Sequence, residues 1–195
     1  MFATINRLQQ ALQKGFSGHI MGEEDCKETW TLDDGSMLTL HHIAPGDAAR
    51  EQAFVRGLST QSSYLRFHGT IKELSKKDLK KFTDPDSGNT VALIVVHDGA
   101  TGEEEIGVAR YVIDTDGKNC EFAVIVADDW QKRGIGTRLM NALIRHLQVS
   151  GVKQISGYVI KRNSAMRKFI KQMGFAETNI PDDSSTLLVT RHLLD

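Results

Sequence analysis

The spacing of hydrophobic positions changes several times along this chain, and each spacing predicts one kind of element. Apolar residues at helical spacing predict a helix over about 5–14, and the Gly-rich, acidic stretch after it predicts a linker or a hairpin. Alternation of apolar and polar residues, or a short apolar run bounded by turn residues, predicts a strand. In chain order, these patterns predict a strand at 37–43, helices at 46–58, at 61–67 and from 75, strands at 91–96, 105–113 and 119–126, a helix from 134, a strand at 154–160, a helix at 164–173, and strands near 176 and at 186–193.

The order of these elements predicts one α/β (α+β) domain. The strands between 91 and 126 follow one another, with Asp98-Gly99 and Asp116-Gly117 as expected turns, so they should form an antiparallel meander. Helices and strands then alternate, which gives a mixed sheet with helices packed on it. A length of 195 residues suits one such domain, expected at 37–195, after an N-terminal helix and acidic appendage at 1–36.

Composition narrows the class of protein. With 40% apolar and 25% charged residues the chain is ordinary for a soluble globular protein. Its longest apolar runs are far shorter than the roughly 20 residues of a membrane span, and its N-terminus lacks the apolar core of a signal peptide, so we expect a cytoplasmic protein without membrane attachment. Cys26 and Cys120 follow no zinc-site spacing and are expected to be free thiols. His41 and His42 face opposite sides of a strand, so no metal site is expected there.

Charge is sorted along the chain. The 47 residues from Trp130 to Ala176 contain ten Lys or Arg and no Asp or Glu, which leaves 14 basic against 25 acidic side chains elsewhere. A locally positive surface on a nearly neutral protein attracts an anionic ligand to one place. This stretch opens with Gln131-Lys132-Arg133-Gly134-Ile135-Gly136 between a predicted strand and a predicted helix. Exposed backbone N–H groups at such a positive helix end favour a phosphate.

Two common phosphate-binding turns do not fit this segment. A Walker loop requires Lys and then Ser or Thr after its last glycine, whereas Thr137 and Arg138 follow Gly136. A dinucleotide fingerprint requires a third glycine where this chain has Leu139. It also requires an acidic residue about 20 positions after the turn, whereas the first acidic residue after Gly136 is Glu177. The sequence therefore disfavours an NTPase and a dinucleotide-binding enzyme.

The remaining pattern resembles the Gln/Arg-x-x-Gly-x-Gly/Ala signature of the GCN5-related N-acetyltransferases (GNAT family), whose turn receives the pyrophosphate of acetyl-coenzyme A (acetyl-CoA). Asn163-Ser164-Ala165-Met166 and Met173-Gly174-Phe175 are similar to that family's Asn-containing helix and Gly-Phe turn, and the element order matches over about 37–193. The stretches 54–59, 63–67 and 121–126 further resemble the acetyltransferase domain of bacterial protein-lysine acetyltransferases of the Pat type. The resemblance implies a GNAT-like, mostly antiparallel sheet flanked by helices on both faces, with acetyl-CoA as cosubstrate.

Glu121 is the candidate general base. Transfer of an acetyl group to an amine requires the neutral amine, and a lysine with a pKa near 10.4 is neutral only about once in two to three thousand molecules at pH 7. Glu121 is the only ionisable side chain between Cys120 and Asp128, and partial burial would raise its pKa toward the range useful for a base. The alternative is a carboxylate at the start of a strand that lies in solvent. The resemblance favours the base, because Pat-type enzymes use a glutamate at this place.

The resemblance also assigns residues to acetyl-CoA. The backbone of Ile125, Val126 and Ala127 is expected to pair with the pantetheine arm as an added strand, and an exposed N–H could polarise the thioester carbonyl. Asn163 has two compatible roles, helix N-cap and cofactor contact. The expected phosphate-turn residues are Gln131, Arg133, Gly134, Gly136 and Thr137, with Arg138 as a further candidate; the candidates for the 3′-phosphate are Lys161, Arg162, Arg167, Lys168 and Lys171, for which a solvated helix face is the alternative.

Three functions remain open. The first is acetylation of lysine side chains of proteins, and the second is acetylation of a small amine such as a polyamine or amino acid, which an enclosed acidic pocket would favour. The third is a non-catalytic acyl-CoA sensor. Nucleic-acid binding is disfavoured because the basic stretch lacks interleaved aromatic residues.

Many small-molecule and N-terminal acetyltransferases of the family carry a tyrosine seven residues after the Asn, as the acid that protonates the departing thiolate. Ile170 occupies that place here, which agrees with the lysine acetyltransferase likeness and argues against Tyr64 or Tyr158 as the acid.

Overall fold

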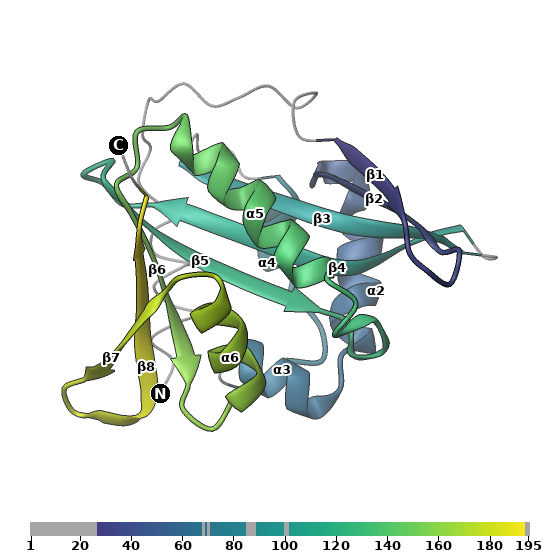
Figure 1. Ribbon diagram of the computed structural model, residues 1–195. Coiled ribbons are helices and arrows are strands. Elements are labelled where there is room, and N and C mark those ends of the chain that lie inside the picture. The colour runs from purple at the N-terminus through teal and green to yellow at the C-terminus, as the bar shows by residue number, and fades with distance from the viewer. Residues whose placement is uncertain (1–26, 68, 70, 85–88, 100–101, 194–195) are drawn as a thin grey trace.

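The computed structural model describes residues 27–67, 69, 71–84, 89–99 and 102–193. Its centre is an eight-stranded sheet in the order β1-β2-β3-β4-β5-β6-β8-β7 (Figure 1). The strands are β1 Glu28–Thr31, β2 Met37–His42, β3 Thr90–Gly99, β4 Gly102–Ile113, β5 Asn119–Val126, β6 Gln154–Ile160, β7 Ala176–Ile180 and β8 Asp183–His192. The helices are α2 Ala48–Gly57, α3 Thr60–Phe67, α4 Lys76–Thr83, α5 Ile135–Gln148 and α6 Ser164–Gln172, with the 3-10 turns η2 Pro45–Asp47 and η3 Asp128–Trp130.

The sheet is mixed and mostly antiparallel, and helices cover both of its faces. Every neighbouring pair of strands is antiparallel except β5 and β6, which are parallel. On one face, α5 and α6 bury a core around Leu143, Ile155 and Ile170. On the other face, a second core around Phe54 and Ile94 lies beneath α2, α3 and α4 (Figure 1). The predicted fold class is therefore confirmed.

Local sequence signals account for the elements nearest the site. The apolar residues of α5 recur every fourth position, and Ile135, Leu139, Leu143 and Leu147 are all at most 1% exposed. Helix α4 begins as its capping sequence predicts. The Ser75 hydroxyl accepts a hydrogen bond from the Asp78 backbone N–H and donates one to the Asp78 carboxylate.

The structure differs from the sequence prediction at the turn expected over Asp98 and Gly99. Strand β3 continues through Asp98 and Gly99, which pair with Glu103 and Gly102, so these two residues are not the hairpin turn. The ladder extends beyond the apolar run because backbone pairing does not require apolar side chains. Strand β1 lies ahead of residue 37 and pairs with β2, so this stretch forms a hairpin, which is one of the two alternatives that its sequence predicts. The helix expected over 5–14 and Cys26 lie outside the described residues.

The β1–β2 hairpin is tied to the basic segment by three arginines. Arg133 forms an ion pair with Asp34 at 2.6 Å, and Arg145 pairs with Glu28. The guanidinium of Arg138 lies 4.6 Å from the ring centroid of Trp30. Three of the ten basic residues between 130 and 176 thus contact this hairpin instead of facing solvent alone.

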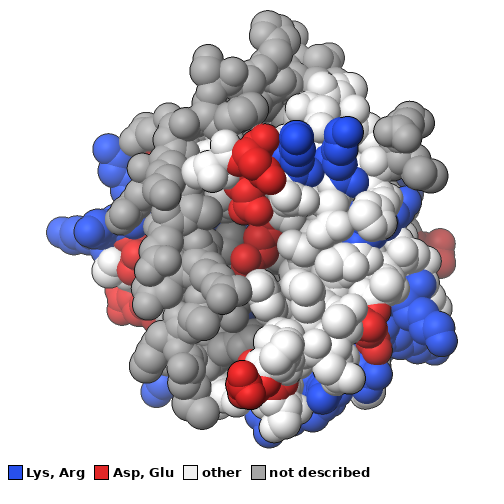
Figure 2. Space-filling view, turned by 90° about the vertical axis from the view of Figure 1, so that its left-hand side faces the viewer, with Lys and Arg blue, Asp and Glu red and all other residues white. Residues whose placement is uncertain are grey.

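The remaining expectations from the sequence concern the cysteines, membrane-spanning segments, metal sites and the charged surface. Cys120 is a free, buried thiol whose pKa is raised by burial. No helix in the described ranges is long and apolar enough to cross a membrane. Among the described residues, no three His, Cys, Asp or Glu side chains could hold a metal ion together. On the side shown in Figure 2, acidic side chains form a column beside a pair of basic ones.

Candidate active site

The site begins where strands β5 and β6 separate. The two strands are paired only at Asn119–Gln154, Cys120–Ile155 and Glu121–Ser156. Beyond Glu121, β5 continues to Val126 in register with β4, while β6 continues to Ile160 in register with β8. Among the described residues, the edge of β5 beyond Glu121 that faces β6 therefore has no strand partner.

The Phe122 ring occupies the point of divergence. A Cβ atom added at Gly157 would lie only 2.7 Å from Cε1 of this ring, so the backbone of β6 closely approaches the aromatic side chain. The ring is buried and packs against Phe175, with 5.1 Å between the ring centroids. Gly157 is thus a position where close approach of a ring requires the absence of a side chain.

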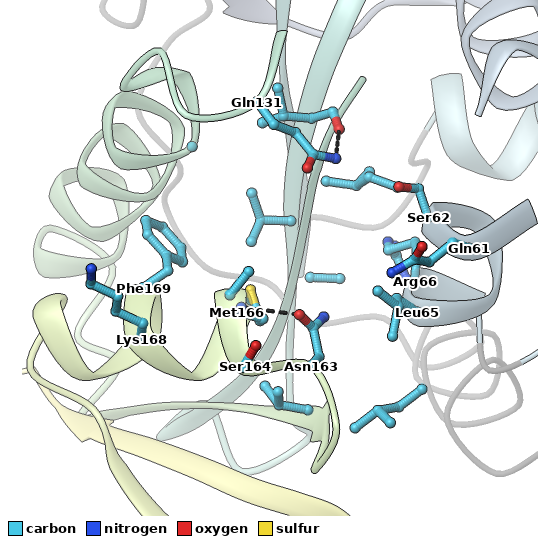
Figure 3. A pocket seen from close by; sticks show the side chains of 18 of the residues that line it. Gln61, Ser62, Leu65, Arg66, Gln131, Asn163, Ser164, Met166, Lys168 and Phe169 are labelled. Carbon is cyan, nitrogen blue, oxygen red and sulfur yellow. Dashed lines mark hydrogen bonds between the residues drawn. The ribbon is translucent and has the colours of Figure 1, made fainter. Parts of the chain in front are cut away.

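A cavity of about 1190 Å³ extends from this point between α3 and α6 (Figure 3). The floor is formed by β5 and β6, one wall by α3, and the other by α6 and the turn before α5. Its lining residues are Thr60, Gln61, Ser62, Tyr64, Leu65, Arg66, Glu121, Phe122, Ala123, Val124, Ile125, Val126, Asp128, Trp130, Gln131, Lys132, Gly134, Gly136, Thr137, Tyr158, Val159, Ile160, Arg162, Asn163, Ser164, Ala165, Met166, Lys168, Phe169 and Gln172.

The turn before α5 has the geometry of an anion site. Gly134 has a φ of 80°, which a side chain would strain. Gly136 has no such φ, and a Cβ there would meet its nearest atom, in the Phe169 ring, at an ordinary 3.8 Å. The protein alone therefore leaves room for a methyl group at Gly136. The first amides of α5 have no partner within the helix, and its first turn contains no acidic residue.

Gln131 and Asn163 stabilise the two sides of the cavity through backbone contacts (Figure 3). The Gln131 side-chain amide donates to the Val126 carbonyl oxygen at 3.1 Å, which ties the turn to the end of β5. The Asn163 side-chain oxygen accepts from the Met166 backbone N–H at 3.0 Å, so Asn163 is the N-cap of α6. The capping role expected for Asn163 is confirmed, and the side chain also lines the cavity.

The structure brings eight of the ten predicted site residues to this cavity, and Ala127 and Arg133 are the two outside its lining. The Ala127 N–H donates to the Ile106 carbonyl oxygen at 2.8 Å, so this amide is engaged within the sheet. Arg133 pairs with Asp34 and lies 4.9 Å from the ring centroid of Trp130. Arg138, the further candidate, also contacts the hairpin. The sequence pattern did not reveal the contacts with Ile106, Asp34 and Trp30, because these partners are far away along the chain.

The basic candidates for the 3′-phosphate divide into two groups. Arg162 and Lys168 line the cavity, whereas Lys161, Arg167 and Lys171 do not. Arg167 forms an ion pair with Glu177 at 2.8 Å. This ion pair raises the pKa of Arg167 and lowers that of Glu177.

Helix α3 supplies a wall that the site prediction did not include. Asp128 holds the start of this helix: its carboxylate accepts hydrogen bonds from the Ser59 N–H at 3.0 Å, the Ser59 hydroxyl at 2.8 Å and the Ser62 hydroxyl at 2.7 Å. Burial opposes ionisation, but these hydrogen bonds lower the pKa of Asp128 overall. Helix α3 is thereby fixed to the segment that enters the glycine turn.

Glu121 on β5 and Arg66 on α3 are two ionisable residues of the cavity lining whose charges act on each other. Both side chains are half-buried. Burial and the nearby Arg110 lower the pKa of Arg66 to about 10, while Glu51 and Glu121 act in the opposite direction. Arg66 therefore remains positively charged at neutral pH. Beneath it, buried Arg110 forms an ion pair with Glu51 at 3.1 Å.

Comparisons with known proteins agree with this geometry. Residues 54–175 match the model of the acetyltransferase (GNAT) family. Acetyltransferase PA5475 of Pseudomonas aeruginosa is 34% identical over 160 residues, which cover 81% of this chain and 85% of that protein. Acetyltransferase Pat of Mycolicibacterium smegmatis is 32% identical over 143 residues, which cover 72% of this chain but only 41% of that longer protein.

Solved structures show the same fold. The GNAT domain of S. lividans PAT superimposes with a TM-score of 0.77 over 89% of this chain and 100% of that domain, at 24% identity. The family match covers more than half of the chain, and the P. aeruginosa relative is similar over most of its length. The protein thus belongs to the GNAT family of N-acetyltransferases, whose members use acetyl-CoA as the acetyl donor.

Proposed function

We propose that this protein transfers the acetyl group of acetyl-CoA to lysine side chains of proteins, with Glu121 as the general base. The observation that carries this proposal is the position of Glu121 at the last paired position of β5 and β6, on the lining of the cavity. A carboxylate at this place lines the same cavity as the unpaired edge of β5 and the wall formed by α3. It can therefore contact an amine that approaches a thioester held along β5.

The residues around the cavity fit acetyl-CoA. The unpaired edge at Ile125 and Val126 suits the pantetheine arm, which pairs with backbone amides as an added strand would. Gly134, Gly136 and Thr137 present the helix end to the pyrophosphate. The room at Gly136, which no protein atom fills, supports a close approach of a ligand there. Asn163 contacts the same ligand from the start of α6.

The chemistry requires a neutral amine next to the thioester. The lysine nitrogen attacks the thioester carbonyl carbon, the carbon–sulfur bond breaks, and Glu121 takes the proton that the nitrogen loses. The positive charge of Arg66 disfavours a second cation beside it, so it favours the neutral form of the incoming amine. Ile170, at the place of the tyrosine acid of many related enzymes, is fully buried in the core. The departing thiolate therefore leaves without a proton from that position, as its pKa of about 8.5 permits.

The cavity is poorly suited to a small polyamine. Its acidic lining residues are Glu121 and Asp128, and the Asp128 carboxylate accepts hydrogen bonds from Ser59 and Ser62. Its basic lining residues are Arg66, Lys132, Arg162 and Lys168. A site that selects a free polycation would need more carboxylates than this. The similarity to Pat of M. smegmatis also supports a protein acceptor.

The test is acetyl transfer by the purified protein to lysine peptides and to small amines, with Glu121→Gln as the variant. Loss of a general base lowers the rate by about 10² to 10⁴-fold, so we expect this loss in kcat at pH 7 with little change in the KM for acetyl-CoA. Glu177→Gln is the matched control, because Glu177 lies on β7 outside the cavity lining. An unchanged rate for Glu121→Gln between pH 6 and pH 9 would refute the base assignment. Binding of acetyl-CoA without transfer to any amine would instead favour the sensor.

A further inference from the structure

We infer that the acceptor side of the cavity recognises an acidic residue next to the target lysine, with Arg162 and Arg66 as the residues that determine this specificity. The inference rests on the proposed lysine acetyltransferase function and adds to it the class of protein segment that is acetylated. It is carried by a contact across the cavity and by the charges around it.

Arg162 and Tyr64 bridge the two walls of the cavity. Arg162 lies in the loop between β6 and α6, and its guanidinium carbon is 4.8 Å from the ring centroid of Tyr64 on α3. Both side chains are exposed, and both line the cavity. In Figure 3, Arg66 and Leu65 lie on the α3 side of the opening and Asn163 and Ser164 on the other side. A peptide that brings a lysine to Glu121 from the α3 side must therefore pass this bridge.

The two arginines differ from most other arginines of the protein in their partners. Arg133, Arg145 and Arg167 each form an ion pair with a carboxylate at the surface. Within the described ranges, neither Arg66 nor Arg162 has a carboxylate oxygen within 4.0 Å. Two carboxylates act on the charge of Arg66: Glu51, which is already paired with Arg110, and the proposed base Glu121. Among the described residues, the acceptor side thus carries two guanidinium groups that no carboxylate contacts in an ion pair.

The chemistry of these groups selects the ligand. A guanidinium binds a carboxylate through two parallel hydrogen bonds, so a Glu or Asp side chain of the acceptor is the fitting partner. An extended peptide advances about 3.3 Å per residue, and an acidic residue one or two positions from the lysine therefore lies within reach of a long arginine side chain. A basic residue at the same position would be repelled by both arginines.

The experiment compares three peptides of equal length that contain one lysine flanked by Glu, Gln or Lys, at saturating acetyl-CoA. The measured quantity is kcat/KM for each peptide. Partly exposed ion pairs contribute about 0.2–1 kcal/mol, so we expect kcat/KM for the Glu peptide to exceed that for the Gln peptide by about 1.4- to 5-fold, and the Lys peptide to be the poorest. Because exposed charges are screened by salt, the differences should shrink in 0.5 M NaCl.

Charge reversal at Arg162 provides the decisive variant. In Arg162→Glu the order should reverse, with the Lys-flanked peptide better than the Glu-flanked one, and in Arg162→Gln the preference should narrow. Lys171→Glu is the matched control, because Lys171 is exposed and lies outside the cavity lining. It should retain the wild-type order. Circular dichroism of each variant establishes that it is folded.

The outcomes separate this inference from the proposed function. Equal rates for the three peptides, or an order that Arg162→Glu leaves unchanged, overturn the inference and leave lysine acetylation standing. A higher KM for acetyl-CoA in Arg162→Glu, with all peptides slowed by the same factor, also overturns it, because Arg162 would then bind the cofactor. Transfer to small amines but to no peptide overturns both.

Discussion

Replacement of Gly157 by alanine is expected to destabilise the protein through one aromatic ring. The added Cβ would lie 2.7, 3.0 and 3.1 Å from Cε1, Cδ1 and Cζ of Phe122. An ordinary contact begins near 3.4 Å, so the ring must move by roughly 0.7 Å. The ring is 4% exposed and rests against Phe175, which restricts this movement.

The expected cost is that of an overpacked core, about 1–3 kcal/mol in the free energy of unfolding. Alanine restricts the unfolded chain more than glycine does, which offsets about 0.4–1 kcal/mol of this cost. Each kcal/mol lowers the melting temperature of a protein of this size by about 2–4 °C. Urea unfolding followed by tryptophan fluorescence measures the free energy directly.

Two further variants distinguish the ring contact from a general effect of alanine. Gly57→Ala, at the end of α2, has no atom within 4 Å of the new Cβ and should leave stability unchanged or raise it by up to about 1 kcal/mol. In a Phe122→Leu background, the smaller side chain should relieve much of the cost of Gly157→Ala. Equal stability of Gly157→Ala and wild type, or an equal cost in both backgrounds, would refute the argument.

Two other changes have expected outcomes. Gly136→Ala should leave stability unchanged or raise it by up to about 1 kcal/mol, because Gly136 lies in α5 and has room for a methyl group, and it should raise the KM for acetyl-CoA. Gly134→Ala should cost about 1–2 kcal/mol because of its positive φ. Urea unfolding and steady-state kinetics check both variants, and an unchanged KM for Gly136→Ala would contradict the close approach of a ligand. Burial and His42 lower the pKa of His146 to about 4. The folded protein therefore holds neutral His146, and this stabilisation is complete above pH 6.5 and is lost as the pH falls toward 4. Between pH 7.5 and pH 5, the loss in the free energy of unfolding is about 2 kcal/mol. His146→Gln should flatten this dependence in urea unfolding at several pH values. The raised pKa of Glu105, caused by burial and by Glu51, stabilises the fold as the pH falls, which is the opposite pH dependence. This effect is the same in variant and wild type, so it cancels in their difference. Parallel pH curves of the two proteins would disprove the assignment to His146.

Local patterns predicted the parts of the site that depend on one segment of chain. The position of Glu121 in an apolar strand, the glycines at the start of α5 and the cap at Asn163 follow from residues close in sequence. The structure places each of these residues on the cavity. The roles of these residues in catalysis and binding stay predictions. Periodicity is a good guide here because a strand or helix is determined mainly by its own side chains.

The contacts that complete the site join distant segments, and no local pattern encodes them. Ser59 and Asp128 are 69 residues apart, and Asp34 and Arg133 are 99 residues apart. In the sequence, Arg133 is one more basic residue of an acid-free stretch, so its expected partner was a phosphate. A strand of four residues such as β1 is also difficult to predict, because its apolar alternation is too short to be distinguished from a loop.

The short strand β1 also protects the rest of the sheet from other molecules. It is the outermost strand on its side and is only four residues long, so it offers few free backbone groups to an approaching chain. A fragment that began at residue 37 would instead expose the edge of β2, next to the buried Leu38 and Leu40. Such an edge is a template for pairing with a second copy. Truncated versions that keep residue 27 onward should therefore remain monodisperse at concentrations where versions that begin at residue 37 aggregate.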